Sequence, residues 1–138
     1  MRSRTLFIAS LLLALVPFIL AQSGMGPSVG GRHYNPATET TLTGTVENVL
    51  QTAGSRGWNG THLSFKTDQG VYDVHVGPSS FLSAQQFPIA KGEKLEITGS
   101  KVQMNGKDVL IARTITKDGK TLELRDAQGI PKWSNASR

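Results

Sequence analysis

Residues 61–76, THLSFKTDQGVYDVHV, have the pattern of a β-hairpin that decides the fold. Successive side chains of a strand point to opposite faces, so alternating apolar and polar residues indicate a strand with one buried face. The apolar positions of the two halves are Leu63, Phe65, Tyr72, Val74 and Val76. Between the halves, Asp68-Gln69-Gly70 supplies the glycine whose positive φ a tight hairpin turn requires.

The other face of this hairpin is polar and is the best candidate for a functional surface. It carries His62, Ser64, Lys66, Asp73 and His75. Of these, His62, Asp73 and His75 form a metal-type cluster, because directly opposed residues of paired strands lie only about 5 Å apart. Imidazole and carboxylate ligands suit Zn²⁺ or Cu²⁺. The alternative interpretation is a solvated sheet face on which the two histidines fall by chance.

The remaining elements extend the hairpin into a barrel. Strand patterns occupy residues 40–50, 94–104, 107–116 and 121–124, and a short helix is predicted over 79–86. Three strands, a helix and two strands is the order of the OB-fold, a small Greek-key barrel. We therefore predict an all-β fold with one short helix: a five-stranded OB-fold-like Greek-key barrel plus a short C-terminal strand. The rival is an open meander sheet with a covering helix.

Parity also predicts which residues fill the barrel. The expected core is Leu63, Phe65, Tyr72, Val74, Leu95, Ile97 and Ile111. In the segment 94–104 the apolar residues change parity, since Leu95 and Ile97 are odd-numbered whereas Val102 and Met104 are even-numbered. Gly99-Ser100 lies at this change and predicts a bulge there.

The two ends of the chain lack the strand pattern of the barrel. Arg2 and Arg4 precede a mostly apolar run that ends at Ala21, which predicts a cleaved signal peptide over 1–21 and a periplasmic or secreted protein with no membrane span afterwards. We expect a flexible linker at 22–39, the barrel domain at 40–125 and an irregular tail at 126–138. The 138-residue chain has no cysteine, which excludes disulfides and thiolate metal sites.

A second candidate site is the glycine-rich loop QTAGSRGWNG, residues 51–60. In OB-folds the loop between the first two strands borders the ligand face. Trp58 could stack on a base or a sugar, Arg56 could pair with an anion, and Lys66 lies on the adjoining polar face. These three residues are the predicted ligand-binding set. The alternative is a tryptophan folded back over the barrel mouth.

Three stretches carry a resemblance to a known family: LTGTVENV (42–49), THLSFKTDQGVYDVHVG (61–77) and GEKLEITGSKV (92–102). They resemble small exported bacterial OB-fold proteins, including the bacterial OB-fold (BOF) family. The resemblance implies an exported OB domain but carries over no ligand residue. The chain departs from it in the loop around Trp58 and in the arm after Asp118.

The predicted function follows from these observations. The chain has no G-x-S-x-G, H-E-x-x-H or Walker motif, so we expect neither an enzyme nor a cofactor. We predict an exported OB-fold binding or adaptor module that recognises an envelope protein, a glycan or a small anionic ligand. The alternatives are single-stranded DNA binding and a periplasmic metal-binding protein. Against DNA, removal of Arg2 and Arg4 lowers the formal net charge from +5 by two, to +3, and Trp58 is the lone stacking platform.

Overall fold

The computed structural model describes residues 33–53 and 59–137. The predicted signal peptide, most of the predicted linker, and the loop residues Arg56 and Trp58 lie outside the described residues. The strands are β1 (Glu39–Ala53), β2 (Asn59–Thr67), β3 (Gly70–Pro78), β4 (Lys94–Met104), β5 (Lys107–Lys117) and β6 (Lys120–Glu123). The helices are the 3-10 turn η1 (Pro36–Thr38), the α-helix α1 (Ser79–Ala84) and the 3-10 helix η3 (Lys132–Ser137).

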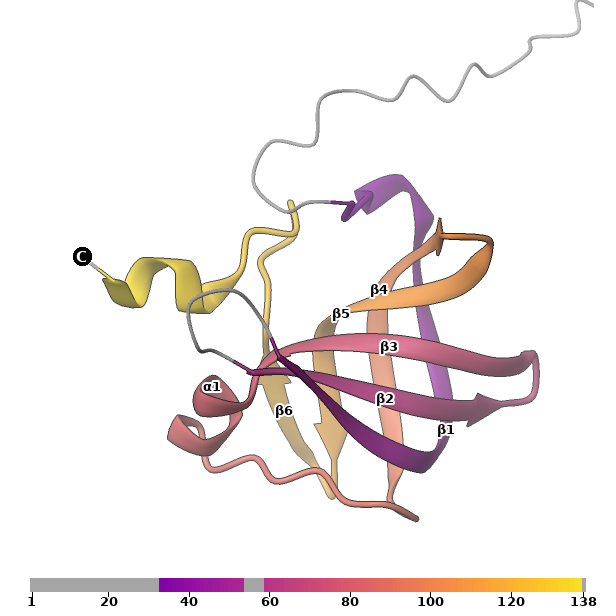
Figure 1. The fold of residues 1–138 in the computed structure, drawn as a ribbon, viewed down its shortest axis with the longest axis horizontal. Helices are drawn as coiled ribbons and strands as arrows, with labels where there is room; N and C mark the ends of the chain where they lie inside the picture. Colours follow the sequence, from indigo (N-terminus) through magenta and orange to yellow (C-terminus); the bar gives the residue numbers. More distant parts are fainter. Residues whose placement is uncertain (1–32, 54–58, 138) are drawn as a thin grey trace, which may run out of the picture.

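The strands form one closed barrel with an appended strand (Figure 1). Their order is β3-β2-β1-β4-β5-β6, and β3 also pairs in parallel with β5, which closes the first five strands. The fold-class prediction is therefore confirmed, and the open meander sheet is excluded by the β3–β5 pairing. The helix α1 covers one end of the barrel, between β3 and β4. No helix within the described ranges is long and apolar enough to cross a membrane.

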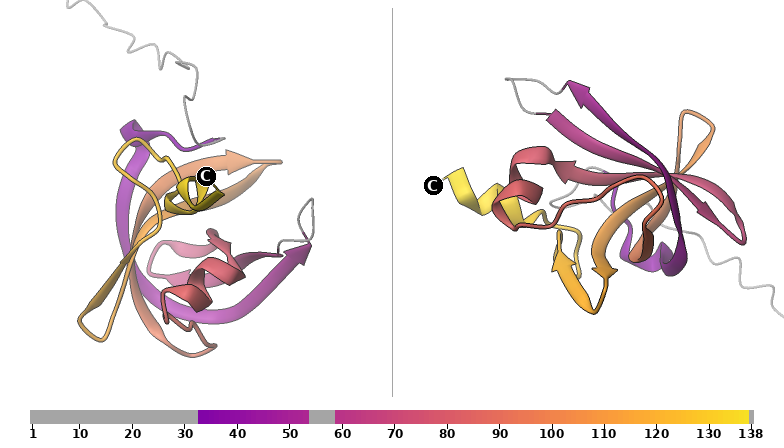
Figure 2. Two further views of the ribbon diagram at one scale, coloured as in Figure 1. Left: turned by 90° about the vertical axis from the view of Figure 1, so that its left-hand side faces the viewer. Right: turned by 90° about the horizontal axis from the view of Figure 1, so that it is seen from below.

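The long first strand allows the barrel to close because it bends strongly (Figure 2). Its first half pairs with β4 and its second half pairs with β2. The register shifts between Val46 and Asn48, which places a bulge at the bend, where the sequence alternation blurs. At Gly44 a Cβ atom would lie 2.2 Å from the carbonyl oxygen of Lys66, so only glycine fits where the strands approach this closely.

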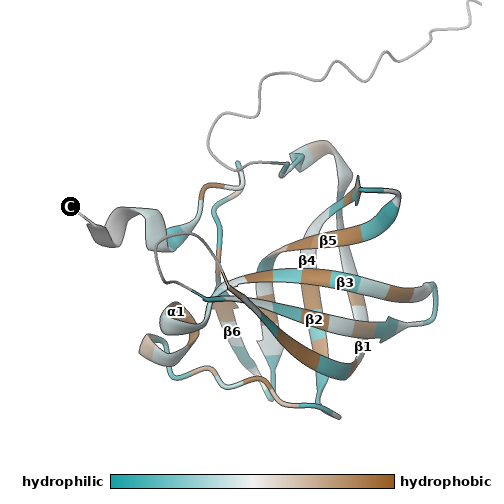
Figure 3. Ribbon diagram, viewed as in Figure 1, coloured by the Kyte–Doolittle hydropathy of each residue, from teal (hydrophilic) through white to brown (hydrophobic). Residues whose placement is uncertain are grey.

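The barrel interior is built from the alternating apolar residues of the strands, visible along β2 and β3 in Figure 3. Phe65 is the largest fully buried side chain. The predicted core residues Leu63, Phe65, Tyr72, Val74, Leu95 and Ile97 are confirmed as members of the main cluster. Ile111 is also buried, but it belongs to a second cluster.

The parity predicted for the last two barrel strands is wrong. We expected β4 to change parity at Gly99-Ser100, but β4 keeps its alternation, and the extra residue of the bulge is Arg113 on β5. Consequently Leu110 joins the main core, whereas Ile111 faces the other side of the sheet. Val102 and Met104, the residues from which we predicted a change of parity on β4, instead face outward.

A second apolar cluster covers these outward-facing residues. It consists of Tyr34, Val109 and Ile111, with Val102 and Met104 packed against them. Tyr34 falls within the predicted linker 22–39, yet only 4% of its surface is exposed. The segment that begins at Tyr34 therefore packs against the barrel instead of forming part of a flexible linker. Burial of the aromatic ring stabilises this position.

Tyr34 is held by a small polar network at the edge of this cluster. Its hydroxyl donates to Glu39 Oε2 at 2.6 Å, and Arg113 Nη2 donates to Glu39 Oε1 at 2.6 Å. Burial, followed by the hydrogen bond and charge of Glu39, raises the pKa of the Tyr34 hydroxyl well above its ordinary value. The phenol therefore stays protonated and acts as a donor, which secures the segment before β1.

A buried arginine, Arg125, forms hydrogen bonds to both β3 and β5 where these two strands pair. Only 8% of Arg125 is exposed, and its Nη1 donates to the carbonyl oxygens of Val76 on β3, at 3.1 Å, and Ala112 on β5. Its guanidinium lies 4.9 Å from the ring centre of Trp133. Burial lowers the pKa of this guanidinium to about 10, so it stays charged at neutral pH. The expected irregular tail 126–138 thus contains η3, whose Trp133 packs against the main core.

We predict that Arg125→Met lowers the free energy of unfolding by about 2–4 kcal/mol, because two buried carbonyl groups lose their donor. Urea unfolding followed by circular dichroism measures this change. The matched control is Lys120→Met, which replaces an exposed cation and should have little effect. Equal stability of the two variants would mean that backbone pairing alone stabilises the contact between β3 and β5.

Candidate metal centre

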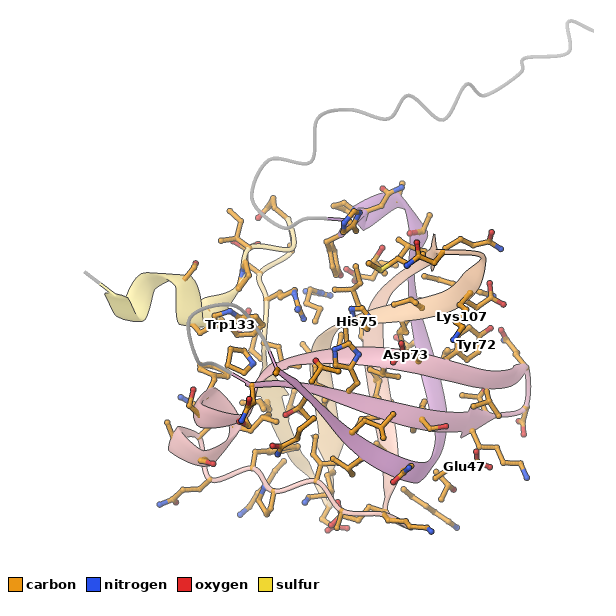
Figure 4. The ribbon with its side chains drawn as sticks, viewed as in Figure 1. Glu47, Tyr72, Asp73, His75, Lys107 and Trp133 are labelled. Carbon is orange, nitrogen blue, oxygen red and sulfur yellow. The ribbon has the colours of Figure 1, made fainter. Side chains whose placement is uncertain are left out.

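The fold brings together the three residues predicted as metal ligands. His62 lies on β2 and pairs directly with His75 on β3, and Asp73 lies two residues before His75 on the same strand. Figure 4 shows the side chains of Asp73 and His75 along β3. All three side chains are partly exposed, by 23% for His62, 41% for Asp73 and 27% for His75, so solvent and ions can reach them.

The carboxylate of Asp73 lies between the two imidazoles. His62 Nδ1 is 3.3 Å from Asp73 Oδ1, and His75 Nε2 is 3.4 Å from Asp73 Oδ2. The two imidazole ring centres are 4.1 Å apart. One ligand atom from each residue lies within 4.8 Å of the others. This spacing fits a shared ion, because tetrahedral bonds of about 2.0–2.1 Å place neighbouring ligand atoms about 3.3–3.4 Å apart.

Two features of the strands position these side chains. The β2–β3 register shifts between Thr61 and His62, so the bulge sets His62 opposite His75. On its other side β3 pairs with β5, where Asp73 is opposite Val109 and His75 is opposite Ile111. Both ligands on β3 are therefore held by backbone pairing on two sides, which limits their movement.

The electrostatic surroundings favour a neutral imidazole at His75. Burial is the main cause that lowers its pKa below the ordinary value of 6.5, and the nearby His62 and, more weakly, Arg125 act in the same direction. The carboxylate of Asp73 opposes them. A neutral imidazole has the free lone pair that metal binding requires.

The predicted ligand-binding set is not brought together by the described residues. Lys66 shares the outer face with the histidines but pairs with Val71, near the turn at the opposite end of the hairpin. Arg56 and Trp58 lie outside the described residues. The prediction for these three residues therefore stays a prediction.

Sequence reasoning missed Arg125, whose charge acts on His75 and whose side chain is buried beside β3 and β5. Arg125 follows Leu124 at the end of the alternating stretch TLEL, residues 121–124, and nothing in that pattern distinguishes it from an exposed arginine. The only sequence signal is indirect. Trp133 lies downstream, and a tryptophan in a polar tail often needs a partner to cover it.

Comparison with known proteins identifies related chains. The model of the MamS/MamX magnetosome protein family matches residues 38–122, which include both strands of the metal-type cluster. Magnetosome protein MamS of Magnetospirillum gryphiswaldense and MamS of Paramagnetospirillum magneticum are each 24% identical over 102 residues. The alignments cover 72% of this chain and 57% of each relative, so the chain spans little more than half of their length.

These matches overturn the resemblance to BOF-like exported OB-fold proteins, which is wrong. The stretches that carried it are strand and turn patterns, and such patterns report architecture rather than ancestry or function. The function predicted with it, a generic periplasmic binding or adaptor module with single-stranded DNA binding as an alternative, is wrong for the same reason. The metal-type cluster is a separate prediction about three residues, and the matches do not bear on it.

We predict that the metal-free protein becomes less stable as the pH falls below about 6.5. The unfolded chain takes up a proton on the imidazole of residue 75 near that pH, whereas folded His75 does so only at lower pH. Over this interval the unfolded state binds more protons, so the free energy of unfolding decreases with falling pH. Urea unfolding between pH 7.5 and 5 in a chelator measures the slope.

His75→Gln should make this slope shallower, because it removes the group that resists protonation. Gln69→Ala, which changes an exposed residue that carries no charge, should leave the slope unchanged. Identical slopes for all three proteins would show that burial of His75 does not affect its titration.

Proposed function

Because the chain belongs to the MamS/MamX magnetosome protein family, we propose that it serves the magnetosome as a barrel domain that binds a divalent transition-metal ion. The ligands in this proposal are His62, Asp73 and His75. The observation that carries it is their spacing, with one ligand atom from each residue within 4.8 Å of the others on two paired strands.

The donor set narrows the choice of ion. Two imidazoles and one carboxylate form the set that holds Fe²⁺ with open coordination positions, and the same donors bind Zn²⁺ and Cu²⁺. Thiolate ligands, which favour Cu⁺, are absent from the sequence. We therefore expect divalent first-row ions to bind, with water molecules occupying the remaining positions.

The partial exposure of the ligands supports an exchangeable ion rather than a structural one. A structural zinc site normally closes its coordination with four protein ligands. Here three side chains lie on the outer face of a barrel whose own apolar core is separate from them. The fold should therefore persist without the ion, and bound metal should add stability only in proportion to its affinity.

We predict that Zn²⁺, and Fe²⁺ under anaerobic conditions, raise the melting temperature of the full-length protein. At a free ion concentration of 100 times the Kd, the gain is about 2.7 kcal/mol. His62→Ala, His75→Ala and Asp73→Asn should each remove most of this gain. Calorimetric titration of the same proteins gives the Kd and the number of ions bound.

His33→Ala is the matched control, because it removes the remaining histidine of the chain, which is exposed and outside the cluster. It should bind metal like the unmodified protein. If the metal-induced gain persists in the cluster variants, the ion binds elsewhere. If the unmodified protein shows no gain, the cluster is a polar group of two imidazoles around the Asp73 carboxylate rather than a metal centre.

A further inference from the structure

Part of β1 lacks a neighbouring strand on one side. The last β1–β4 pair joins Thr45 and Lys94, and the backbone of Val46 then bonds to residues 92 and 93 at 2.7 and 2.9 Å. Among the described residues, 48–53 pair with β2 alone. Backbone N–H and C=O groups on the other side of this segment therefore meet no strand of the barrel.

The structure indicates which groups face this open side. The N–H of Val49 donates to the side-chain Oδ1 of Asn48 on its own strand at 3.0 Å, and we infer from this bond that it points away from β2. Because these groups alternate along a strand, Gln51 and Ala53 present the next outward N–H and C=O groups. The segment 48–53, NVLQTA, contains neither a charged residue nor proline, the features that normally protect an edge from pairing.

A cavity of about 340 Å³ runs beside this edge, between β1 and α1. Its lining includes Val49 and Gln51 on β1, Leu82 on α1, and Phe87 in the segment that follows. Every residue that lines it is uncharged. A charged ligand would lose its hydration there without gaining an ion partner, so the lining favours an uncharged occupant.

A buried hydroxyl without a partner also faces this cavity. Thr61 on β2 lines the cavity and is only 3% exposed, yet its Oγ1 has no hydrogen-bond partner. Leaving a buried hydroxyl unpaired costs roughly 1–3 kcal/mol, so such groups usually have a partner or a functional reason. An occupant of the cavity with a polar backbone would supply this partner.

From these observations we propose that an extended, uncharged peptide segment of a partner protein docks along residues 48–53 as an added strand. Its backbone would pair with the outward groups of Gln51 and Ala53 and with the carbonyl oxygen of Val49, and alternate side chains would enter the cavity. A peptide of about six residues spans this edge at roughly 3.3 Å per residue. The site is separate from the metal centre, because its side chains face the inner side of the sheet while His62 faces the outer side.

The proposal is tested with a phage-displayed library of seven-residue peptides, selected on the full-length protein. Enriched peptides are synthesised, and their affinities are measured by fluorescence polarisation. We expect uncharged, β-branched sequences to be enriched. Gln51→Pro removes an outward N–H that the β2 ladder does not use, so it should weaken these peptides at least about tenfold. Gln51→Ala keeps the N–H and should retain most of the affinity.

Thr61→Val provides a second test. A purely structural role of Thr61 would not predict opposite effects on stability and on peptide binding. Replacing an unpaired hydroxyl with a methyl group of similar size should raise the melting temperature of the free protein. The same change should weaken the selected peptides by roughly three- to tenfold, the worth of one hydrogen bond. Val71→Thr, at an exposed position on β3, is the control and should change neither quantity.

Three outcomes would overturn the proposal. Selected peptides that bind Gln51→Pro as tightly as the unmodified protein dock elsewhere. Failure to enrich any peptide would mean that the edge takes no strand. Sedimentation showing a dimer that Gln51→Pro dissociates would assign the edge to a second copy of this chain. If Gln51→Pro does not fold, the opposite effects expected of Thr61→Val on stability and on binding still decide the question.

Discussion

The parallel pairing of β3 with β5 is the constraint on which the rest of the structure depends. Asp73, Val74 and His75 pair with residues 109–111, and this short contact turns an open sheet into a barrel. Without it, β3 would be an edge strand, and two of the three proposed metal ligands would lie on a hairpin arm with one free side. An edge strand is held by backbone pairing on one side only, so closure supplies rigidity that a metal site needs.

The C-terminal segment takes part in this closure through Arg125. Burying a guanidinium costs free energy, and the lowered pKa of about 10 reflects that cost. Hydrogen bonds to one carbonyl on each closing strand, together with the ring of Trp133, offset it. The match to the MamS/MamX family ends at residue 122, just before Arg125. Arg125 therefore lies beyond the matched region, although both strands that it contacts lie within it.

Sequence alone predicted the hairpin, the main core and the grouping of His62, Asp73 and His75, because each follows from strand alternation and one short turn. It did not predict the second cluster, since Tyr34 comes from a glycine- and proline-rich segment with no periodicity of its own. It located the register shift beside Gly99 but assigned the bulge to β4 instead of β5, because Val102 faces outward against a residue that is distant in sequence. The open edge of β1 depends on where pairing with β4 ends, which only the assembled barrel determines.

The part of the barrel formed by β1, β2 and β3 thus carries both proposed sites. Its outer face holds the metal-type cluster, and its open edge lies beside a neutral cavity. The claim that closure assembles a metal centre is tested most directly by long-range ¹H–¹⁵N NMR of the imidazole nitrogens during a Zn²⁺ titration. We expect the signals of His62 Nδ1 and His75 Nε2 to shift together at one equivalent, while those of His33 do not. Shifts confined to His33, or equal weak shifts of all three histidines, would contradict it.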